Sequence, residues 1–456
     1  MQPTNAKIFF GSLWPTAPEG LKISSVATDS RNAQANGVFV AIKGEHVDGH
    51  DYAATALQNG AAVVVATHPV DGVPLDKTVL VKDPLNAMIE LGGNYRGQFH
   101  PLVLGVTGSV GKTTTKEFCA AVLQPFGATV KTEGNQNNEI GMPNTLFRLD
   151  ENTRYAVVEM GTQMLGDIRK LSLAAKPDAA VITRIGTAHL ETLGSVENVL
   201  HAKLEICDGL ATGAPLILNG DDPMLWKAVL PAHVRPVYAG IQNAECEIRA
   251  TDICREGMGQ SFTIADKRYG NFSVYIEALG EHNIYNALMA YTAATRLGLS
   301  APTAAEALKN FKNTGMRQNI VKKKEVTVIE DCYNASPDSM RAALSTLRDM
   351  DVPGKRIAVL GDMLELGSVS EDAHKELADL CANAGVNLLL TVGQRAAAAV
   401  PRAQGFGINA LAQQNNTEAA RQLLKNVQPG DAILVKASRG MKFEEIIETF
   451  FAQDGK

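Results

Sequence analysis

The chain has 456 residues, of which 45% are apolar and 20% charged, a composition typical of a soluble globular protein with roughly three domains. Only 5% of the residues are aromatic, which argues against a surface that stacks nucleic-acid bases. The 43 lysines and arginines are outnumbered by 49 acidic residues, and the net charge of −6 excludes an overall positive field that would attract nucleic acid or anionic lipid. Any anionic ligand must therefore be held by a local site.

The cysteines and the N-terminal segment indicate a reducing compartment. No CxxC pair occurs and no histidine stands at zinc-finger spacing, so we expect reduced thiols in the core. No basic stretch leads into a long apolar run at the N-terminus, and no run of about 18 apolar residues occurs. These features predict a cytoplasmic protein without membrane insertion. The six cysteines are Cys119, Cys207, Cys246, Cys254, Cys332 and Cys381.

Residues 1–99 predict a small N-terminal α/β domain. Apolar runs at residues 38–42 and 61–66 are typical of short strands, and residues 52–58 favour a helix between them. The polar segment 94–101 contains Gly and Pro and indicates a linker.

Residues 100–314 predict a central domain of the P-loop type. The apolar runs LVLGV, YAVVEM, AAVITRI and PLILNG alternate with helix-length segments, as parallel strands joined by crossover helices do. The more polar stretch 246–276 favours an antiparallel edge, and residues 283–297 favour a helix.

Residues 315–456 begin at a Gly-containing turn and predict a second doubly wound sheet. The runs VTVIED, RIAVLGD, NLLLTVG and AILVKAS are each separated by a helix-length segment. The expected fold class is thus α/β with three domains: a small N-terminal α/β domain, a central P-loop-type domain with a mostly parallel sheet, and a C-terminal Rossmann-like domain.

The strongest local signal is the run LVLGVTGSVGKTTTK from residue 102, an apolar strand followed by a Gly-containing turn and a helix. Backbone N–H groups of such a turn converge on phosphate oxygens, Lys112 would reach the β- and γ-phosphates, and Thr113 would bind Mg²⁺. The run misses the GxxxxGK[ST] pattern by one place, because Val106 stands where the first glycine belongs. A purely structural turn is the alternative. The predicted ATP contacts are Thr107, Gly108, Ser109, Val110, Gly111, Lys112, Thr113 and Thr114.

Five further polar residues lie at or beyond the ends of buried runs in the central domain. Glu159 ends YAVVE, where a carboxylate for a nucleotide-bound Mg²⁺ is expected, although a cap or a surface charge is the alternative. His189 and Glu191 are expected in a loop at the same end of the sheet, and Lys203 and Glu205 in a helix. Spacing alone does not distinguish a functional His189 from a structural histidine, or a functional Lys203 from a solvated lysine.

Nine segments of the central and C-terminal domains resemble the Mur ligases of bacterial cell-wall (peptidoglycan) synthesis, and TDSR at residues 28–31 extends the resemblance to the N-terminal domain. The resemblance implies an ATP-dependent ligase, and the pair DCYNASP and LGDMLELG favours the branch that joins D-alanyl-D-alanine to UDP-N-acetylmuramoyl-tripeptide. A family member that adds the third peptide residue and a folylpolyglutamate synthase are the alternatives, whereas a P-loop GTPase switch lacks an NKxD sequence. The segments are TGSVGKTTTKE, GNQNNEIGMPNTL, EMG, GTAHLETLGS, AKLEI, GEHNIYNA, DCYNASPDSM, LGDMLELG and KASRGMKFE.

The resemblance also implies roles for single residues. Lys112 would contact ATP phosphates, Thr113 and Glu159 would hold one Mg²⁺, and His189 a second. Lys203 resembles the lysine that the family carbamylates, a modification that turns a cation into an anion able to reach the metal. The remaining expected contacts are Asn283, Asn286, Arg317, Asp331, Tyr333 and Asn334 for ATP, Ser30 and Arg31 for the UDP end, and Asn137 and Asn138 for the muramyl side.

The resemblance assigns one task to each domain. The N-terminal domain would hold the UDP end of the substrate, the central domain would bind ATP, and the C-terminal domain would close over both and bind the dipeptide. ATP would convert the tripeptide carboxylate into an acyl phosphate, which water would hydrolyse in an open site, so we expect a hinge motion at the second linker. The resemblance favours a monomer.

Overall fold

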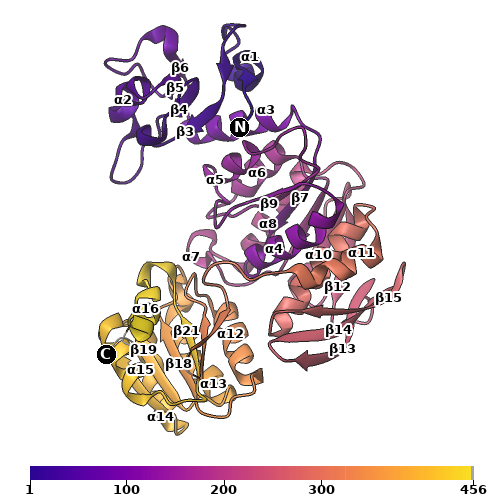
Figure 1. The fold of residues 1–456 in the computed structure, drawn as a ribbon, viewed down its shortest axis with the longest axis vertical. Helices are drawn as coiled ribbons and strands as arrows, with labels where there is room; N and C mark the ends of the chain where they lie inside the picture. The colour runs from indigo at the N-terminus through magenta and orange to yellow at the C-terminus, as the bar shows by residue number, and fades with distance from the viewer. Residues whose placement is uncertain (324, 453–456) are drawn as a thin grey trace.

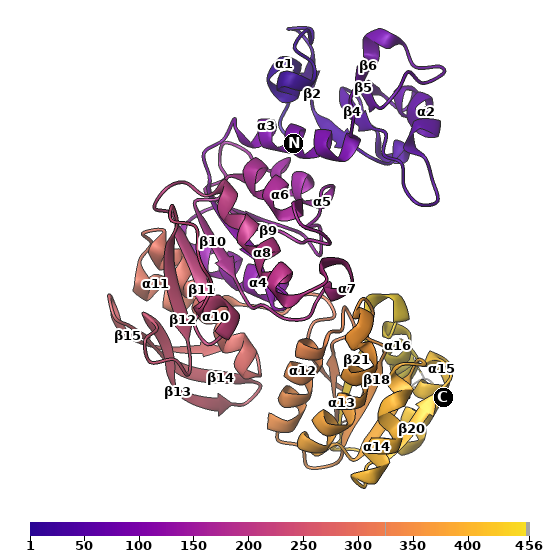
Figure 2. The same ribbon diagram turned by 180° about the vertical axis from the view of Figure 1, so that it is seen from behind.

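The computed structural model describes residues 1–323 and 325–452 and arranges them around three main sheets that follow one another along the chain. The N-terminal and C-terminal portions lie on opposite sides of the central portion (Figures 1 and 2). The predicted α/β fold with three domains is confirmed.

The N-terminal portion contains a four-stranded parallel sheet in the order β3-β4-β5-β6. Short apolar runs build it, and the predicted strands and helix of this region are present. Its strands are β3 (Ser25–Ala27), β4 (Gly37–Val40), β5 (Ala61–Ala66) and β6 (Thr78–Leu80), with helix α2 (Ala53–Gln58) beside β5. The antiparallel pair β1 (Thr4–Asn5) and β2 (Lys22–Ile23) and the helix α1 (Ala6–Phe10) precede or flank this sheet.

Helix α3 (Pro84–Arg96) attaches the N-terminal portion to the central domain. It packs on α1 and on the central helices α5 (Gly141–Leu146) and α6 (Asp167–Ala175). Tyr95 is fully buried and donates a hydrogen bond to the carbonyl of Leu149 at 2.9 Å. The prediction that residues 94–101 form a linker is therefore wrong for the first three of them, because apolar contacts across the boundary continue the helix.

The central sheet has nine strands in the order β15-β14-β13-β12-β11-β10-β7-β9-β8. The seven strands from β7 to β13 run parallel, and the antiparallel pairing of β14 with β13 and β15 confirms the predicted antiparallel edge. The strands are β7 (Leu102–Thr107), β8 (Thr129–Lys131), β9 (Tyr155–Glu159), β10 (Ala179–Ile182), β11 (Pro215–Asn219), β12 (Arg235–Gly240), β13 (Ile248–Glu256), β14 (Gly259–Asp266) and β15 (Gly270–Ile276).

Alternating residues of the central strands fill two cores, one on each face of the sheet. Val103 packs with helices α3, α5 and α6 and with α8 (Val196–Leu204), whereas its neighbour Leu104 packs on the other face. There α4 (Lys112–Leu123) and α10 (Glu281–Arg296) lie against each other, and α11 (Ala301–Ala307) covers the edge. Burial on both faces explains why these strands appear as continuous apolar runs.

The C-terminal sheet has six strands in the order β16-β17-β21-β18-β19-β20, all parallel except β16. Two edge strands, β16 and β20, were not predicted, because an edge strand is only partly buried and lacks a continuous apolar run. The strands are β16 (Asn319–Lys323), β17 (Val326–Glu330), β18 (Arg356–Gly361), β19 (Leu388–Val392), β20 (Asn409–Gln413) and β21 (Ala432–Lys436). The helices are α12 (Pro337–Asp349), α13 (Ser370–Asn383), α14 (Val400–Gly405), α15 (Asn416–Asn426) and α16 (Glu444–Ala452).

The six cysteines are free thiols, as predicted, and five of them are buried. Cys254 is exposed, so the prediction of a core thiol is wrong there; it lies on the solvent-facing end of β13. Within the described residues, no helix has the length and apolar character needed to cross a bilayer.

Candidate active site

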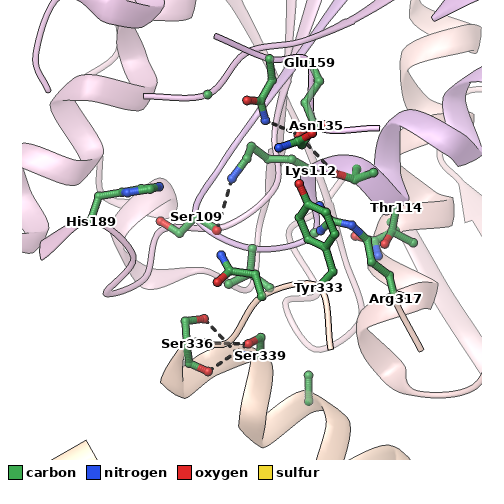
Figure 3. A pocket seen from close by; sticks show the side chains of 18 of the residues that line it. Ser109, Lys112, Thr114, Asn135, Glu159, His189, Arg317, Tyr333, Ser336 and Ser339 are labelled. Carbon is green, nitrogen blue, oxygen red and sulfur yellow. Dashed lines mark hydrogen bonds between the residues drawn. The ribbon is translucent and has the colours of Figure 1, made fainter. Parts of the chain in front are cut away.

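A cavity of about 440 Å³ lies where the central and C-terminal domains meet. The central domain contributes the loop after β7, the segment after β9 and the start of α10, and the C-terminal domain contributes the turn after β17 and the start of α12. Figure 3 shows Glu159 and Ser336 on opposite sides of it. The cavity thus lies at the carboxyl ends of parallel strands, where doubly wound sheets bind ligands.

The predicted phosphate loop connects β7 to α4 and is fixed to the neighbouring strand β10. Thr183 donates from Oγ1 to the carbonyl of Val110 at 2.5 Å, and the backbone N–H of Ser109 donates to the carbonyl of Arg184 at 2.8 Å. Gly108 and Gly111 have φ angles of +144° and +86°, which L side chains rarely adopt. The loop therefore has a fixed shape before any ligand binds.

Gly108→Ala should damage this loop. A Cβ at Gly108 would lie 2.0 Å from Oγ1 of Thr183 and 3.1 Å from its backbone nitrogen, and φ would stay unfavourable. We expect a loss of about 1–3 kcal/mol in the free energy of unfolding, measured in urea, and weaker nucleotide binding. Gly213→Ala is the control, because Gly213 has a φ of +83° and nothing within 4 Å of its Cβ position. Equal losses in both variants would contradict the clash.

Lys112 lies at the first turn of α4 and points back over the loop (Figure 3). Its Nζ donates to the carbonyls of Gly108 at 2.8 Å and Ser109 at 3.4 Å. Burial lowers the pKa of Lys112, Glu159 opposes this shift, and Arg317 adds to it. A desolvated cation near a second cation favours binding of an anion, so the geometry supports phosphate binding here.

Glu159 and Thr113 form the part of the site that fits a magnesium ion. Glu159 is 1% exposed, and its Oε1 accepts hydrogen bonds from Oγ1 of Thr113 at 3.1 Å and Nδ2 of Asn137 at 2.7 Å. Among the described residues its buried Oε2 has no hydrogen-bond partner and lies 3.8 Å from Nζ of Lys116. An orphaned carboxylate oxygen beside a hydroxyl is a suitable donor set for Mg²⁺.

His189 lines the same cavity and precedes the short helix α7 (Leu190–Leu193) with a φ of +60°. Glu191 is therefore helical, not in a loop as predicted. Burial and the nearby cations Lys112 and Lys203 lower the pKa of His189 to about 4, so the imidazole is neutral at pH 7. In the described chain, no cluster of three acidic, histidine or cysteine side chains could hold a metal alone. A second Mg²⁺ at His189 stays a prediction.

Lys203 is fully buried in α8. Within the part of the chain that the structure describes, its Nζ has no hydrogen-bond partner. Burial, followed by the charge of Lys112, lowers the pKa of Lys203 well below its usual value. The interpretation from spacing alone, a solvated lysine, is wrong, since the helix turns this side chain into the core. Glu205 lies two residues later, at the start of a 3-10 helix, and accepts a hydrogen bond from the backbone N–H of Gly166 at 2.6 Å.

The turn after β17 brings the predicted C-terminal residues to the cavity. Asp331, Tyr333 and Asn334 line it, and the guanidinium of Arg317 lies 3.9 Å from the centre of the Tyr333 ring. Burial raises the pKa of Asp331, and Lys436 opposes this shift. These contacts stack a cation on an aromatic ring at the cavity wall.

Two buried lysines near the cavity were not predicted from the sequence as residues of the site. Lys436 donates to Oδ2 of Asp331 at 2.7 Å and to the carbonyl of Asn334 at 3.0 Å, so it holds the turn after β17 in place. Lys116 is fully buried, with Nζ 3.2 Å from Oε1 of Glu117. A lysine at the carboxyl end of the apolar run AILVK was a signal for Lys436, whereas nothing in the sequence distinguishes Lys116 from a solvated lysine.

The predicted adenine contacts are bonded to the first turn of α4, directly after the phosphate loop. Oδ1 of Asn286 accepts a hydrogen bond from Oγ1 of Thr115 at 3.0 Å, and Nδ2 of Asn286 donates to Oδ1 of Asn283 at 3.2 Å. Both asparagines line the cavity. Contact with adenine stays a prediction.

The remaining substrate residues divide between two places. Asn137 and Asn138 line the cavity, whereas Ser30 and Arg31 lie in the N-terminal portion and do not line it. Arg31 is exposed and pairs with Asp29 at 2.6 Å. The structure thus gathers the predicted muramyl residues and most of the predicted ATP residues at the cavity and leaves the predicted UDP residues apart. Thr107 and Gly108 do not line the cavity, because Thr107 is fully buried and donates from Oγ1 to the carbonyl of Met160 at 2.8 Å.

A phosphate loop, a buried carboxylate beside it and a second α/β domain at the same cavity define a nucleotide-binding enzyme whose site is shared between domains. Three family models match the chain: the Mur ligase family catalytic domain at residues 22–84, the Mur ligase middle domain at 106–294 and the Mur ligase glutamate ligase domain at 316–439. The chain belongs to the Mur ligase family and is a ligase.

Full-length relatives agree with this assignment. The chain is 39% identical to the UDP-N-acetylmuramoyl-tripeptide--D-alanyl-D-alanine ligase of Bacillus subtilis over 97% of this chain and 96% of the relative. It is similar to MurF from Acinetobacter baumannii, with a TM-score of 0.90 and 30% identity over 99% of both chains. MurF from Thermotoga maritima, solved in complex with ADP, has a TM-score of 0.83 and 29% identity over 94% of this chain and 97% of that chain.

Proposed function

We propose that this chain joins D-alanyl-D-alanine to UDP-N-acetylmuramoyl-tripeptide at the expense of ATP, as a cytoplasmic monomer. The observation that carries the proposal is the convergence of the phosphate loop, Glu159 and His189 on one cavity that the C-terminal domain also lines, with Lys203 buried close to Lys112. Similarity to ligases with this activity over nearly the whole chain supports it and favours it over the two alternative amide ligases.

The chemistry follows from the poor reactivity of a carboxylate towards an amine. A tripeptide carboxylate oxygen attacks the γ-phosphorus of ATP and ADP leaves, which gives an acyl phosphate. The dipeptide ammonium first releases a proton to solvent, and the free amine attacks the acyl carbon and loses a second proton. Phosphate then leaves from the tetrahedral intermediate. Lys112 would stabilise the charge on the phosphoryl oxygens, because its desolvated ammonium lies on the phosphate loop.

Thr113 and Glu159 would hold the magnesium ion, with His189 as the expected ligand of a second one. Bound Mg²⁺ would supply neutralisation of the phosphate charge. Lys203 would be carbamylated: its neutral nitrogen bonds to the carbon of CO₂ and releases a proton. The support is the lowered pKa of the buried amine, since only a neutral amine attacks CO₂.

Each domain would handle one part of the substrate. Residues 1–99 would hold the UDP end through Ser30 and Arg31, residues 100–314 would bind ATP, and residues 315–456 would bind the dipeptide. Hinge closure at the second linker stays a prediction.

A substrate screen tests the function. Purified enzyme is incubated with ATP, Mg²⁺ and UDP-N-acetylmuramoyl-tripeptide and with single amino acids or D-alanyl-D-alanine in turn. We expect a product with the mass of UDP-pentapeptide, together with phosphate release, only in the incubation that contains D-alanyl-D-alanine. In parallel incubations a UDP-dipeptide or a folate replaces the UDP-tripeptide, and product formed there with a free amino acid would identify one of the alternatives.

A further inference from the structure

The loop at residues 362–367 of the C-terminal domain reaches the central domain beside His189. Oε2 of Glu365 lies 3.1 Å from Nδ1 of His189. A Cβ at Gly367 would lie 3.4 Å from Cα of Glu191, so the two backbones approach closely there. In Figures 1 and 2, α7 lies between the central and C-terminal domains. Glu365 thus extends from one domain to His189, which lines the cavity formed with the other.

The backbone of this loop is held by its own domain. Met363 donates its N–H to Nε2 of His374 at 2.9 Å, and Leu364 donates its N–H to Oγ of Ser438 at 3.0 Å. Glu365 itself has a φ of +62°, an uncommon conformation for a residue other than glycine. Its carboxylate is 62% exposed. A braced, strained backbone that presents an accessible carboxylate at a domain junction is typical of a ligand-binding residue.

The positive charges at the cavity are unfavourable for an incoming ammonium group unless a carboxylate lies beside it. Lys112 and Arg317 line the cavity, and Lys203 is buried close to Lys112, which suits the binding of phosphates. The incoming dipeptide carries an ammonium group at neutral pH, and these cations repel it. A carboxylate on the side of the acceptor amine would offset that repulsion and orient the nitrogen.

Three carboxylates that line the cavity accept hydrogen bonds from protein groups, whereas Glu365 has a single polar contact among the described residues, with the His189 ring. Glu159 accepts from Thr113 and Asn137, Asp167 accepts the backbone N–H groups of residues 163 and 164, and Asp331 accepts from Lys436. Glu139 also lines the cavity and is the rival candidate. It lies on the central domain, next to the predicted muramyl contacts, whereas Glu365 comes from the domain expected to deliver the dipeptide.

We propose that Glu365 binds the N-terminal ammonium of the incoming D-alanyl-D-alanine and holds its nitrogen beside His189, next to the phosphate loop. The inference rests on the proposed function and deepens it, because it assigns the acceptor end of the site to the LGDMLELG segment. Leu364, which is 41% exposed, provides an apolar surface beside the ammonium site for the small side chain of the dipeptide.

Glu365→Gln tests the inference. Steady-state kinetics should show a KM for D-alanyl-D-alanine raised roughly tenfold or more, since a hydrogen bond to a charged group is lost. The dissociation constant of Mg²⁺ with a non-hydrolysable ATP analogue, measured by calorimetry, should stay within twofold. Glu371→Gln is the matched control, because Glu371 lies on the same domain, 76% exposed, and pairs only with Lys375 among the contacts of the described residues. This control should behave as the unchanged enzyme.

A ligand without the ammonium separates the proposed role from a structural one. D-lactyl-D-alanine carries a hydroxyl in place of the amine, so its inhibition constant should differ by less than twofold between the unchanged enzyme and Glu365→Gln. An unchanged dipeptide KM in Glu365→Gln, a raised one in Glu139→Gln alone, or weakened Mg²⁺-nucleotide binding in Glu365→Gln would overturn the inference. Failure of the unchanged enzyme to form UDP-pentapeptide would instead overturn the proposed function.

Discussion

Lys112→Ala should lower kcat for ligation by roughly 10²- to 10³-fold, because it removes the ammonium that faces the transferring phosphoryl group. The lysine lies on the phosphate loop, and its Nζ reaches the carbonyls of Gly108 and Ser109. Phosphate release measured in the presence of all substrates gives the rate. Lys227→Ala, an exposed lysine of the same domain, is the control and should keep full activity.

The same substitution should leave the fold intact. Lys112 makes only two hydrogen bonds to loop carbonyls in the described structure, and burial penalises its charge. We therefore expect the midpoint of thermal unfolding without nucleotide to shift little. Retained ligation by Lys112→Ala would remove this residue from the catalytic set, whereas a large drop in the midpoint would indicate a structural role.

Lys203→Met should lower kcat by roughly 100-fold and at the same time stabilise the protein. Removing a carbamate that reaches the metal costs activity. Removing a buried amine that has no hydrogen-bond partner among the described residues should raise the free energy of unfolding by about 1–3 kcal/mol at pH 7. Urea titration and ligation rates measure both effects. A variant that is active, or that is less stable than the unchanged protein, would contradict this account.

The increase in the free energy of unfolding caused by Lys203→Met should depend on pH in a defined direction. Burial holds the pKa of Lys203 well below its usual value in the folded chain, whereas the unfolded chain keeps a pKa of about 10.4. The folded state thus binds fewer protons, so the stability of the unchanged protein rises with pH up to about 10.4. In buffer free of carbon dioxide, the advantage of Lys203→Met should be largest in acid and shrink towards alkaline pH. A constant difference would mean that Lys203 keeps its ordinary pKa in the folded chain.

The response of activity to carbon dioxide distinguishes a carbamylated Lys203 from an unmodified amine. If Lys203 is carbamylated, activity of the unchanged enzyme should fall when bicarbonate is removed and recover when it is restored, because the modification is reversible. Lys203→Met should show no such response.

Local patterns predicted most of the fold. Strands buried on both faces appear as continuous apolar runs, so β7, β9–β11, β17–β19 and β21 were predictable. The edge strands β16 and β20 lacked that signal, and the end of α3 depended on packing of Tyr95 against residues far along the chain. Cys254 was misplaced for a related reason, because burial is set by neighbouring elements and not by residue type.

The sequence by itself determined the phosphate loop, since a strand, a glycine turn and a helix start that follow one another need no distant partner to form a cradle. Only the tertiary structure decided which lysines are buried and what they face. Lys436 meets Asp331 across 105 residues of chain, Lys203 loses water because helices cover it, and Glu365 meets His189 across a domain junction. Desolvation and charge pairing depend on groups that converge in space, and one-dimensional spacing does not record that convergence.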